Sequence, residues 1–154
     1  MARMIAEKSD ITPMLAELFR RHGYEGASIG IIVSATGLGR SSLYHLFPGG
    51  KQEMATAVLD HIARWFGENV FAPLRGMAPD AALDHMFSAV SDYFRGGQRI
   101  CLVGAFALDA TRDSFAQEIQ TYFNDWLTAL EQCLRRAGHS DAQARTEAQR
   151  ILAG

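Results

Sequence analysis

One short stretch of the sequence, GLGRSSLYHLFPGGK at residues 37–51, combines glycines with side chains that can bind phosphate or transfer protons. A nucleotide-binding phosphate loop follows a strand and ends in Gly-Lys-Ser/Thr. Here a helical pattern precedes the glycines, and Gln52 follows Lys51. The sequence context therefore argues against a nucleotide-binding loop.

A catalytic serine–histidine pair is the second chemistry that these residue types permit. Ser41 and His45 are four residues apart and would meet on one face of a helix. A working pair also needs a third group that orients the imidazole ring, and no such group is placed nearby. The stretch is therefore not favoured as a catalytic site.

A helix-turn-helix explains the same residues better. Ser28 is a good cap for a helix over residues 28–36, Gly37 and Gly39 allow a tight turn, and residues 40–47 form a second short helix. Pro48 and the two glycines after it must end that helix. A capped helix, a glycine turn and a short second helix are the elements of this DNA-binding motif.

The second helix of this motif would turn Leu43, Leu46 and Phe47 inward and leave polar side chains outside or at the edge. Short serines let a helix enter the major groove, arginine reaches guanine edges or phosphate, and tyrosine and histidine donate hydrogen bonds to phosphates or bases. A lysine at a helix N-terminus favours phosphate. The residues proposed on these grounds are Arg40, Ser41, Ser42, Tyr44, His45 and Lys51. A solvated helix of an ordinary bundle would show the same pattern, so the residues alone leave both interpretations open.

The rest of the chain indicates which elements hold this motif. Apolar residues recur with the helical period and nowhere alternate with period two, which predicts an all-α fold. We expect helices over residues 11–23, 28–36, 40–47, 51–66, 80–95, 102–110, 115–137 and 140–154. Ser9 or Asp10 can cap the first helix, and residues 67–79, rich in Pro and Gly, should form an irregular connection or a broken helix end.

Length and composition are those of a globular protein with one sizeable core or two small cores. The chain has 154 residues, of which 48% are hydrophobic, and a formal net charge of −2. Residues 1–51 hold six Lys/Arg against four Asp/Glu, a balance of +2, whereas the remainder holds nine against thirteen, a balance of −4. Because residues 1–51 are slightly basic although the rest of the chain is acidic, the charge distribution is compatible with nucleic-acid binding by the N-terminal region.

No apolar run reaches the length of a membrane helix, and the N-terminus lacks the apolar segment of a secretory signal, so we expect no membrane partner and a cytoplasmic location. Cys101 and Cys133 have no metal-site spacing and should be buried free thiols. We expect neither a metal nor a cofactor.

A set of residues at fixed spacing adds a family resemblance: Leu18-Phe19, Gly23-Tyr24, Ser28, Ile32, Gly37, Leu43-Tyr44, Phe47 and Lys51. On these marks, residues 11–54 resemble the N-terminal DNA-binding domain of TetR-type transcriptional regulators, and the Pro-Gly-Gly-Lys turn resembles the LmrA/YxaF-like subgroup. The resemblance implies a homodimeric repressor whose second motif helix enters the major groove of double-stranded operator DNA. It also implies that Ser28, Tyr44 and Lys51 anchor phosphates. Thr36 departs from the family pattern, which more usually has alanine there.

The resemblance further implies two domains, a helix-turn-helix DNA-binding domain over residues 1–49 and a helical ligand-binding and dimerisation domain over residues 50–154. Because family members are usually longer, the last helix, 140–154, looks cut short at its C-terminal end. A dense set of aromatic residues, Met and one Asp on the body helices could line a cavity for a small hydrophobic effector. These residues are Trp65, Phe66, Met86, Phe87, Phe94, Phe106, Asp109, Tyr122, Phe123 and Trp126. Plain core packing is the alternative explanation for most of them.

The function expected from these features is that of a ligand-responsive repressor, not an enzyme. Two alternatives remain at this point. In the first, the body is a helical enzyme that uses His61, His85 or Asp109; in the second, it is a protein-binding module without a DNA function. The spacing of the three titratable residues does not indicate a catalytic cluster.

Overall fold

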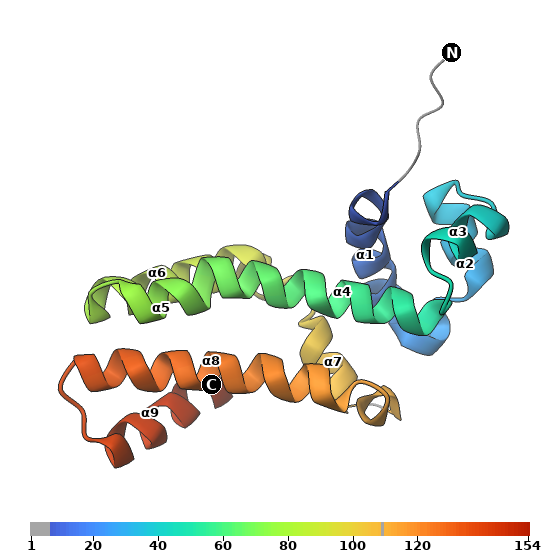
Figure 1. Cartoon of the computed structure of the whole chain (residues 1–154). Coiled ribbons are helices and arrows are strands. Elements are labelled where there is room, and N and C mark those ends of the chain that lie inside the picture. The colour runs from blue at the N-terminus through green and yellow to red at the C-terminus, as the bar shows by residue number, and fades with distance from the viewer. Residues whose placement is uncertain (1–6, 109) are drawn as a thin grey trace. The chain divides into compact units, whose positions relative to one another are not determined.

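The computed structural model describes residues 7–108 and 110–154, and within these ranges the fold contains helices and no strand, which confirms the all-α prediction. The chain divides into two compact units (Figure 1). Unit 1 comprises Met1–Ile62 and Cys101–Ala116, and unit 2 comprises Ala63–Ile100 and Gln117–Gly154. Among the described residues, no helix has both the length and the apolar character needed to span a membrane.

Unit 1 begins with α1 (Lys8–Gly26), whose buried face includes Leu15 and Phe19. Its N-cap is Glu7, whose backbone N–H donates to the Asp10 carboxylate at 3.1 Å. The prediction of Ser9 or Asp10 as the cap was therefore wrong, because the helix starts one turn earlier than the apolar periodicity does. The predicted end near Gly23 corresponds to a kink, since Gly23 has φ +74°.

The next two helices match the predicted motif. Helix α2 spans Ile29–Thr36, and the Ser28 hydroxyl caps it by accepting a hydrogen bond from the Ile31 N–H at 3.2 Å. Gly37 ends α2 in the left-handed region, with φ +74°, where glycine carries no steric cost. Helix α3 follows as Arg40–Leu46, with Phe47 at its C-cap.

Helix α4 (Lys51–Phe66) does not lead into an irregular connection, which was one of the two forms predicted for residues 67–79. It continues through a π-helical turn, Gly67–Phe71, into α5 (Ala72–Gly76). Pro73 has no N–H and cannot donate to the carbonyl oxygen of Asn69. The His85 Nε2 atom lies 2.9 Å from that oxygen. Because a carbonyl only accepts, Nε2 is the protonated nitrogen, and its bond supports the backbone where proline interrupts the ladder.

Unit 2 is completed by α6 (Pro79–Tyr93), α8 (Ala116–Arg136) and α9 (Asp141–Ala153). The Arg136 guanidinium donates to the carbonyl oxygens of Leu74 and Met77, at 2.6 and 2.9 Å, and so ties α8 to the end of α5. Ser140 caps α9 by accepting from the Gln143 N–H at 3.2 Å, as the sequence predicted.

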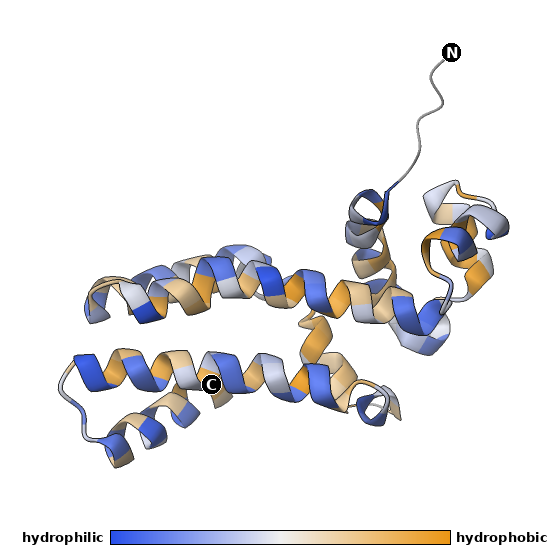
Figure 2. Ribbon diagram, in the orientation of Figure 1, coloured by the Kyte–Doolittle hydropathy of each residue, from blue (hydrophilic) through white to orange (hydrophobic). Residues whose placement is uncertain are grey.

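Helix α7 (Leu102–Leu108) belongs to unit 1 and is almost wholly apolar, as its orange colour in Figure 2 shows. Leu102, Val103 and Phe106 are buried, and α7 packs on α1. Cys101, just before α7, is half-buried, and Cys133 on α8 is buried. Both cysteines are free, and desolvation raises the pKa of both thiols. The prediction of buried free thiols therefore holds in full for Cys133, whereas Cys101 is free but only half-buried.

Candidate functional site

Helix α3 has one buried and one solvent-facing side. Leu43 and Phe47 are completely buried, whereas Tyr44 keeps 43% of its surface exposed. The exposed residues of α3 are Arg40, Ser41, Ser42, Tyr44 and His45. Five of the predicted DNA-binding residues therefore lie on the exposed side of one short helix. The apolar residues on the opposite side of that helix are buried in unit 1.

The turn between α2 and α3 is fixed by local hydrogen bonds. The Thr36 hydroxyl donates to the Ile32 carbonyl at 2.7 Å and accepts from the Leu38 N–H at 3.3 Å. Alanine at this position could make neither bond. Thr36, which departs from the usual family pattern, is thus one reason why α3 leaves α2 at a defined angle.

The turn between α3 and α4 places Tyr44 beside the start of α4. Gly50 has φ +71°, and a Cβ atom there would lie 3.4 Å from Cε1 of Tyr44. The tyrosine ring therefore rests against the glycine of the turn. Glycine is favoured at this point by the left-handed backbone conformation, whereas a Cβ atom at 3.4 Å would make an ordinary van der Waals contact with the ring.

Glu53 stabilises the same turn. Its Oε2 accepts from the Gly49 N–H at 2.8 Å, and its Oε1 lies 3.3 Å from Nζ of Lys8. The Gly49 hydrogen bond, followed by that of Lys8, holds the pKa of Glu53 below its usual value. Glu53 was not among the residues proposed from the sequence. Its position was a usable signal, because an acidic residue at the third position of a helix often accepts hydrogen bonds from the free N–H groups at the helix N-terminus.

Lys51 has an aromatic neighbour that the sequence analysis also did not assign. Its Nζ atom lies 4.6 Å from the centroid of the Tyr24 ring, within the range of a cation–π interaction. Desolvation, followed by the charge of Glu25, raises the pKa of the Tyr24 hydroxyl, so this ring stays neutral at physiological pH. Lys51 itself is half-buried at the first position of α4.

Ser28 is exposed, and its oxygen caps α2. We expect Ser28→Ala to lower the free energy of unfolding by about 1 kcal/mol through loss of the cap. Ser28→Asp keeps a capping oxygen and should leave stability almost unchanged, yet weaken DNA binding because its carboxylate repels phosphate. Urea unfolding and fluorescence anisotropy with a DNA duplex measure the two effects. If Ser28→Asp binds DNA as the parent does, Ser28 does not face phosphates.

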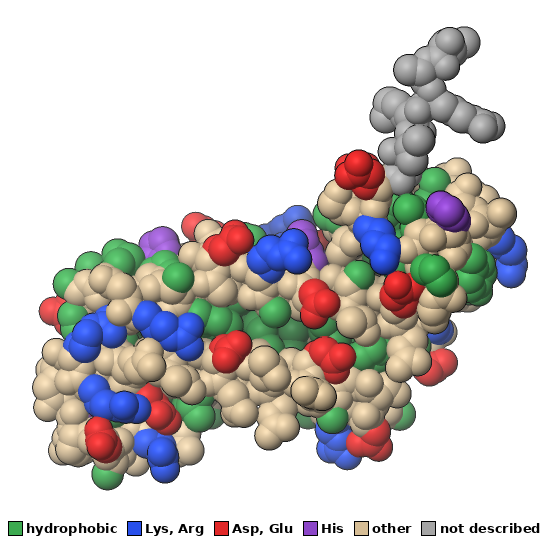
Figure 3. Space-filling model, viewed as in Figure 1, with side chains coloured by type: hydrophobic (Ala, Val, Ile, Leu, Met, Phe, Trp, Pro, Cys, Tyr) green, Lys and Arg blue, Asp and Glu red, His purple; other side chains and the backbone are tan. Residues whose placement is uncertain are grey.

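Charge on the surface is mixed. On the face drawn in Figure 3, Lys and Arg side chains are interspersed with Asp and Glu instead of gathering in one patch. This face therefore shows no broad positive patch that could attract nucleic acid.

The ten residues proposed for ligand binding do not all lie together. Seven of the ten lie together in unit 2 through ring contacts and a 3.4 Å hydrogen bond from Trp126 Nε1 to Met86 Sδ. They are Trp65, Phe66, Met86, Phe94, Tyr122, Phe123 and Trp126, and we call them the aromatic cluster. Phe106 instead packs in unit 1, Phe87 is 57% exposed on α6, and Asp109 lies outside the described residues.

Phe66 lies at the centre of the aromatic cluster. Its ring centroid is 5.0 Å from those of Trp65 and Tyr93, 5.3 Å from that of Tyr122 and 5.4 Å from that of Trp126. Tyr93 and Phe71 also join these contacts, although the sequence analysis did not propose them. Phe71 lies in the segment for which no regular helix was predicted, so the sequence assigned it to no helical face.

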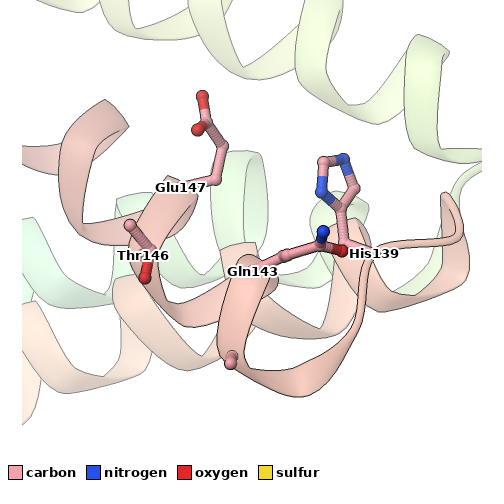
Figure 4. Close-up of a pocket in the computed structure, with 5 residues that line it drawn as sticks. His139, Gln143, Thr146 and Glu147 are labelled. Carbon is pink, nitrogen blue, oxygen red and sulfur yellow. The ribbon is translucent and has the colours of Figure 1, made fainter.

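A surface hollow of about 430 Å³ lies elsewhere, at the start of α9. Its lining includes His139, which precedes α9, and Gln143, Thr146 and Glu147, which belong to α9 (Figure 4). No residue of the aromatic cluster lines this hollow. Its polar side chains do not match the apolar effector expected from the sequence.

Comparison with known proteins decides the family. The model of "Bacterial regulatory proteins, tetR family" matches residues 15–58, which contain α2, α3 and most of α1. The model "Transcriptional regulator LmrA/YxaF-like, C-terminal domain" matches residues 79–154. The chain belongs to the TetR family of transcriptional regulators. Both the family and the LmrA/YxaF-like subgroup predicted from the sequence are confirmed.

Individual relatives agree with the TetR assignment. The chain is 22% identical over 143 residues to the HTH-type transcriptional regulator LmrA of Bacillus subtilis (strain 168), covering 90% of this chain and 76% of that protein. The crystal structure of a TetR transcriptional regulator from Legionella pneumophila superposes with a TM-score of 0.84 at 19% identity, over 99% of this chain and 84% of that chain. The second match shows that the fold is shared.

The TetR chain is accordingly a DNA-binding transcriptional regulator with a helix-turn-helix. The family and its relatives are regulators and not enzymes, so the enzymatic alternative is not supported. Proteins of this family bind operator DNA.

Proposed function

We propose that the chain is a homodimeric, ligand-responsive repressor that inserts α3 into the major groove of its operator. The observation that supports this best is the division of α3 into a buried seam, Leu43 and Phe47, and an exposed face. On that face Arg40 is the candidate for guanine edges or phosphate, Ser41 and Ser42 permit close approach, and His45 is a further donor.

Phosphate contacts are proposed at both ends of this motif. Ser28 lies at the N-terminus of α2, where its oxygen accepts from Ile31 and its O–H can still donate to a phosphate. Tyr44 rests against the α3–α4 turn, and Lys51 begins α4. The positive end of the helix dipole adds to the lysine charge there, which favours a bound phosphate.

We propose that residues 1–49 form the DNA-binding domain, to which Lys51 adds a phosphate contact from the start of α4, and that residues 50–154 bind the effector and form the dimer. The effector is a small hydrophobic molecule, and the aromatic cluster is its binding region. Its binding favours a conformation whose two recognition helices no longer fit the operator. An effector acts in this way only through a difference in affinity between the two conformations.

The effector proposal can be tested through the reciprocity of linked binding. Trp65 and Trp126 are the two tryptophans of the chain and both lie in the aromatic cluster, so ligand binding there should change intrinsic fluorescence. A panel of small aromatic and acyl compounds is titrated into the protein, and each binder is then tested for release of an operator duplex by anisotropy. A compound that changes the fluorescence should weaken operator binding, and the operator should weaken that compound's binding by the same factor. If every compound that binds the cluster leaves operator affinity unchanged, the ligand response is contradicted.

A further inference from the structure

The side chains of Lys51 and Tyr24 are in contact. The Lys51 ammonium lies over the face of the ring, 4.6 Å from its centroid, and both residues belong to unit 1. We infer that Tyr24 is a positioning residue, which holds the Lys51 ammonium at the N-terminus of α4 for contact with a DNA phosphate. This inference rests on the proposed role of Lys51.

The ring of Tyr24 is itself held by packing. It stacks on Phe19 at 6.0 Å between centroids and meets the edges or faces of Phe106 and Phe115 at 6.1 and 5.5 Å. These three phenylalanines are each 1% exposed, so they form a fixed support. Gly23, with φ +74°, turns the chain just before Tyr24. The tyrosine therefore offers the lysine a rigid platform and not another mobile side chain.

A rigid platform matters because lysine is a flexible side chain that loses conformational entropy when it binds a phosphate. Contact with the ring face restricts the ammonium before DNA arrives. It leaves N–H donors available, because an ammonium group has three and the ring face needs no specific one of them. The interaction uses the ring and not the hydroxyl, so phenylalanine should replace Tyr24 without loss.

The test is a double-mutant cycle on the full chain, with a fluorescent duplex of random sequence at low salt as the probe. Lys51→Met should weaken binding and reduce the salt dependence by about one counterion per subunit. Tyr24→Leu, which keeps an apolar side chain but no ring, should weaken binding by about three- to tenfold. Tyr24→Phe should stay within about twofold of the parent. In the Lys51→Met background, Tyr24→Leu should have almost no further effect.

Each result of this cycle decides something different. If Lys51→Met leaves binding unchanged while the parent binds well, Lys51 makes no phosphate contact, and the inference falls although DNA binding itself stands. If Lys51→Met weakens binding and Tyr24→Leu does not, the phosphate contact stands and the positioning role is wrong. If Tyr24→Leu weakens binding equally with and without Lys51, Tyr24 acts through general packing, and the positioning role is again wrong.

A second measurement needs no variant of Tyr24 and therefore does not depend on how such variants fold. The sequence contains two lysines, Lys8 and Lys51, so 13C-lysine labelling gives two side-chain signals, which Lys8→Arg assigns. The ring of Tyr24 should shift the Lys51 Hε resonances upfield in the free protein. Resonances of Lys51 at the positions of a free lysine would overturn the inference.

Discussion

Replacement of both Arg40 and Tyr44 by alanine is expected to weaken binding to a specific operator duplex by about 100-fold or more, because each lost contact to a base or phosphate is worth roughly 1–3 kcal/mol. Both side chains are on the exposed side of α3, although Tyr44 keeps only 43% of its surface exposed and its ring rests against Gly50. Fluorescence anisotropy at a fixed salt concentration measures the affinity, and circular dichroism verifies that helix content is retained.

Arg112→Ala is the matched control for this pair of substitutions. Arg112 is an exposed arginine of unit 1 whose side chain pairs with Asp113 at 3.7 Å and has no proposed DNA contact. It should bind the operator as the parent does. Equal affinities of the parent and the Arg40→Ala/Tyr44→Ala protein would show that α3 does not contact the DNA.

Phe66→Ala should produce the largest loss of stability, about 3–5 kcal/mol, because it leaves a cavity at the centre of the aromatic cluster. Phe66 is completely buried and its ring contacts those of Trp65, Tyr93, Tyr122 and Trp126. Loss of that size is a large part of the stability of a small protein. Urea unfolding followed by tryptophan fluorescence measures it, since both tryptophans lie in this cluster.

Phe87→Ala tests whether the loss comes from burial and not from the residue type. Phe87 is on α6 but 57% exposed, and its removal should cost less than about 1 kcal/mol. If the two phenylalanine variants lose equal stability, the assignment of Phe66 to the centre of the packing is wrong.

The helix-turn-helix could be predicted closely from the sequence because its determinants are local. Ser28 and Gly37 define the ends of α2 through a cap and a left-handed residue, and Pro48 with the following glycines defines the end of α3. Burial of Leu43 and Phe47 follows from their helical spacing. These signals act over a few residues, so periodicity and capping rules are sufficient to predict the ends of these helices and their buried sides.

Features that depend on distant residues were not predictable in the same way. Residues 67–76 stay helical although they contain Gly67 and Pro73, and His85, from another helix, binds the backbone at Asn69. The contact of Lys51 with Tyr24 likewise joins two different helices. The spacing of residues within one helix does not predict contacts between residues of different helices.

The same limit applies to the body of the protein. Aromatic residues were recognised as a set, but Phe106 packs on Phe19 in unit 1 and Phe87 faces solvent. Helical periodicity assigns a face to each helix without saying which other helix covers that face. The domain limit at residue 49 and the individual DNA and ligand contacts stay predictions.

Selection from a library of random duplexes tests most directly that this chain recognises DNA sequence through α3. The parent protein and the Arg40→Ala/Tyr44→Ala variant are carried through the same rounds, and the bound duplexes are sequenced. The parent should enrich one sequence, arranged as two half-sites about 10 base pairs apart if it binds as a dimer, and the variant should enrich none. Failure of the parent to enrich any sequence, or enrichment of the same sequence by the variant, would contradict the account.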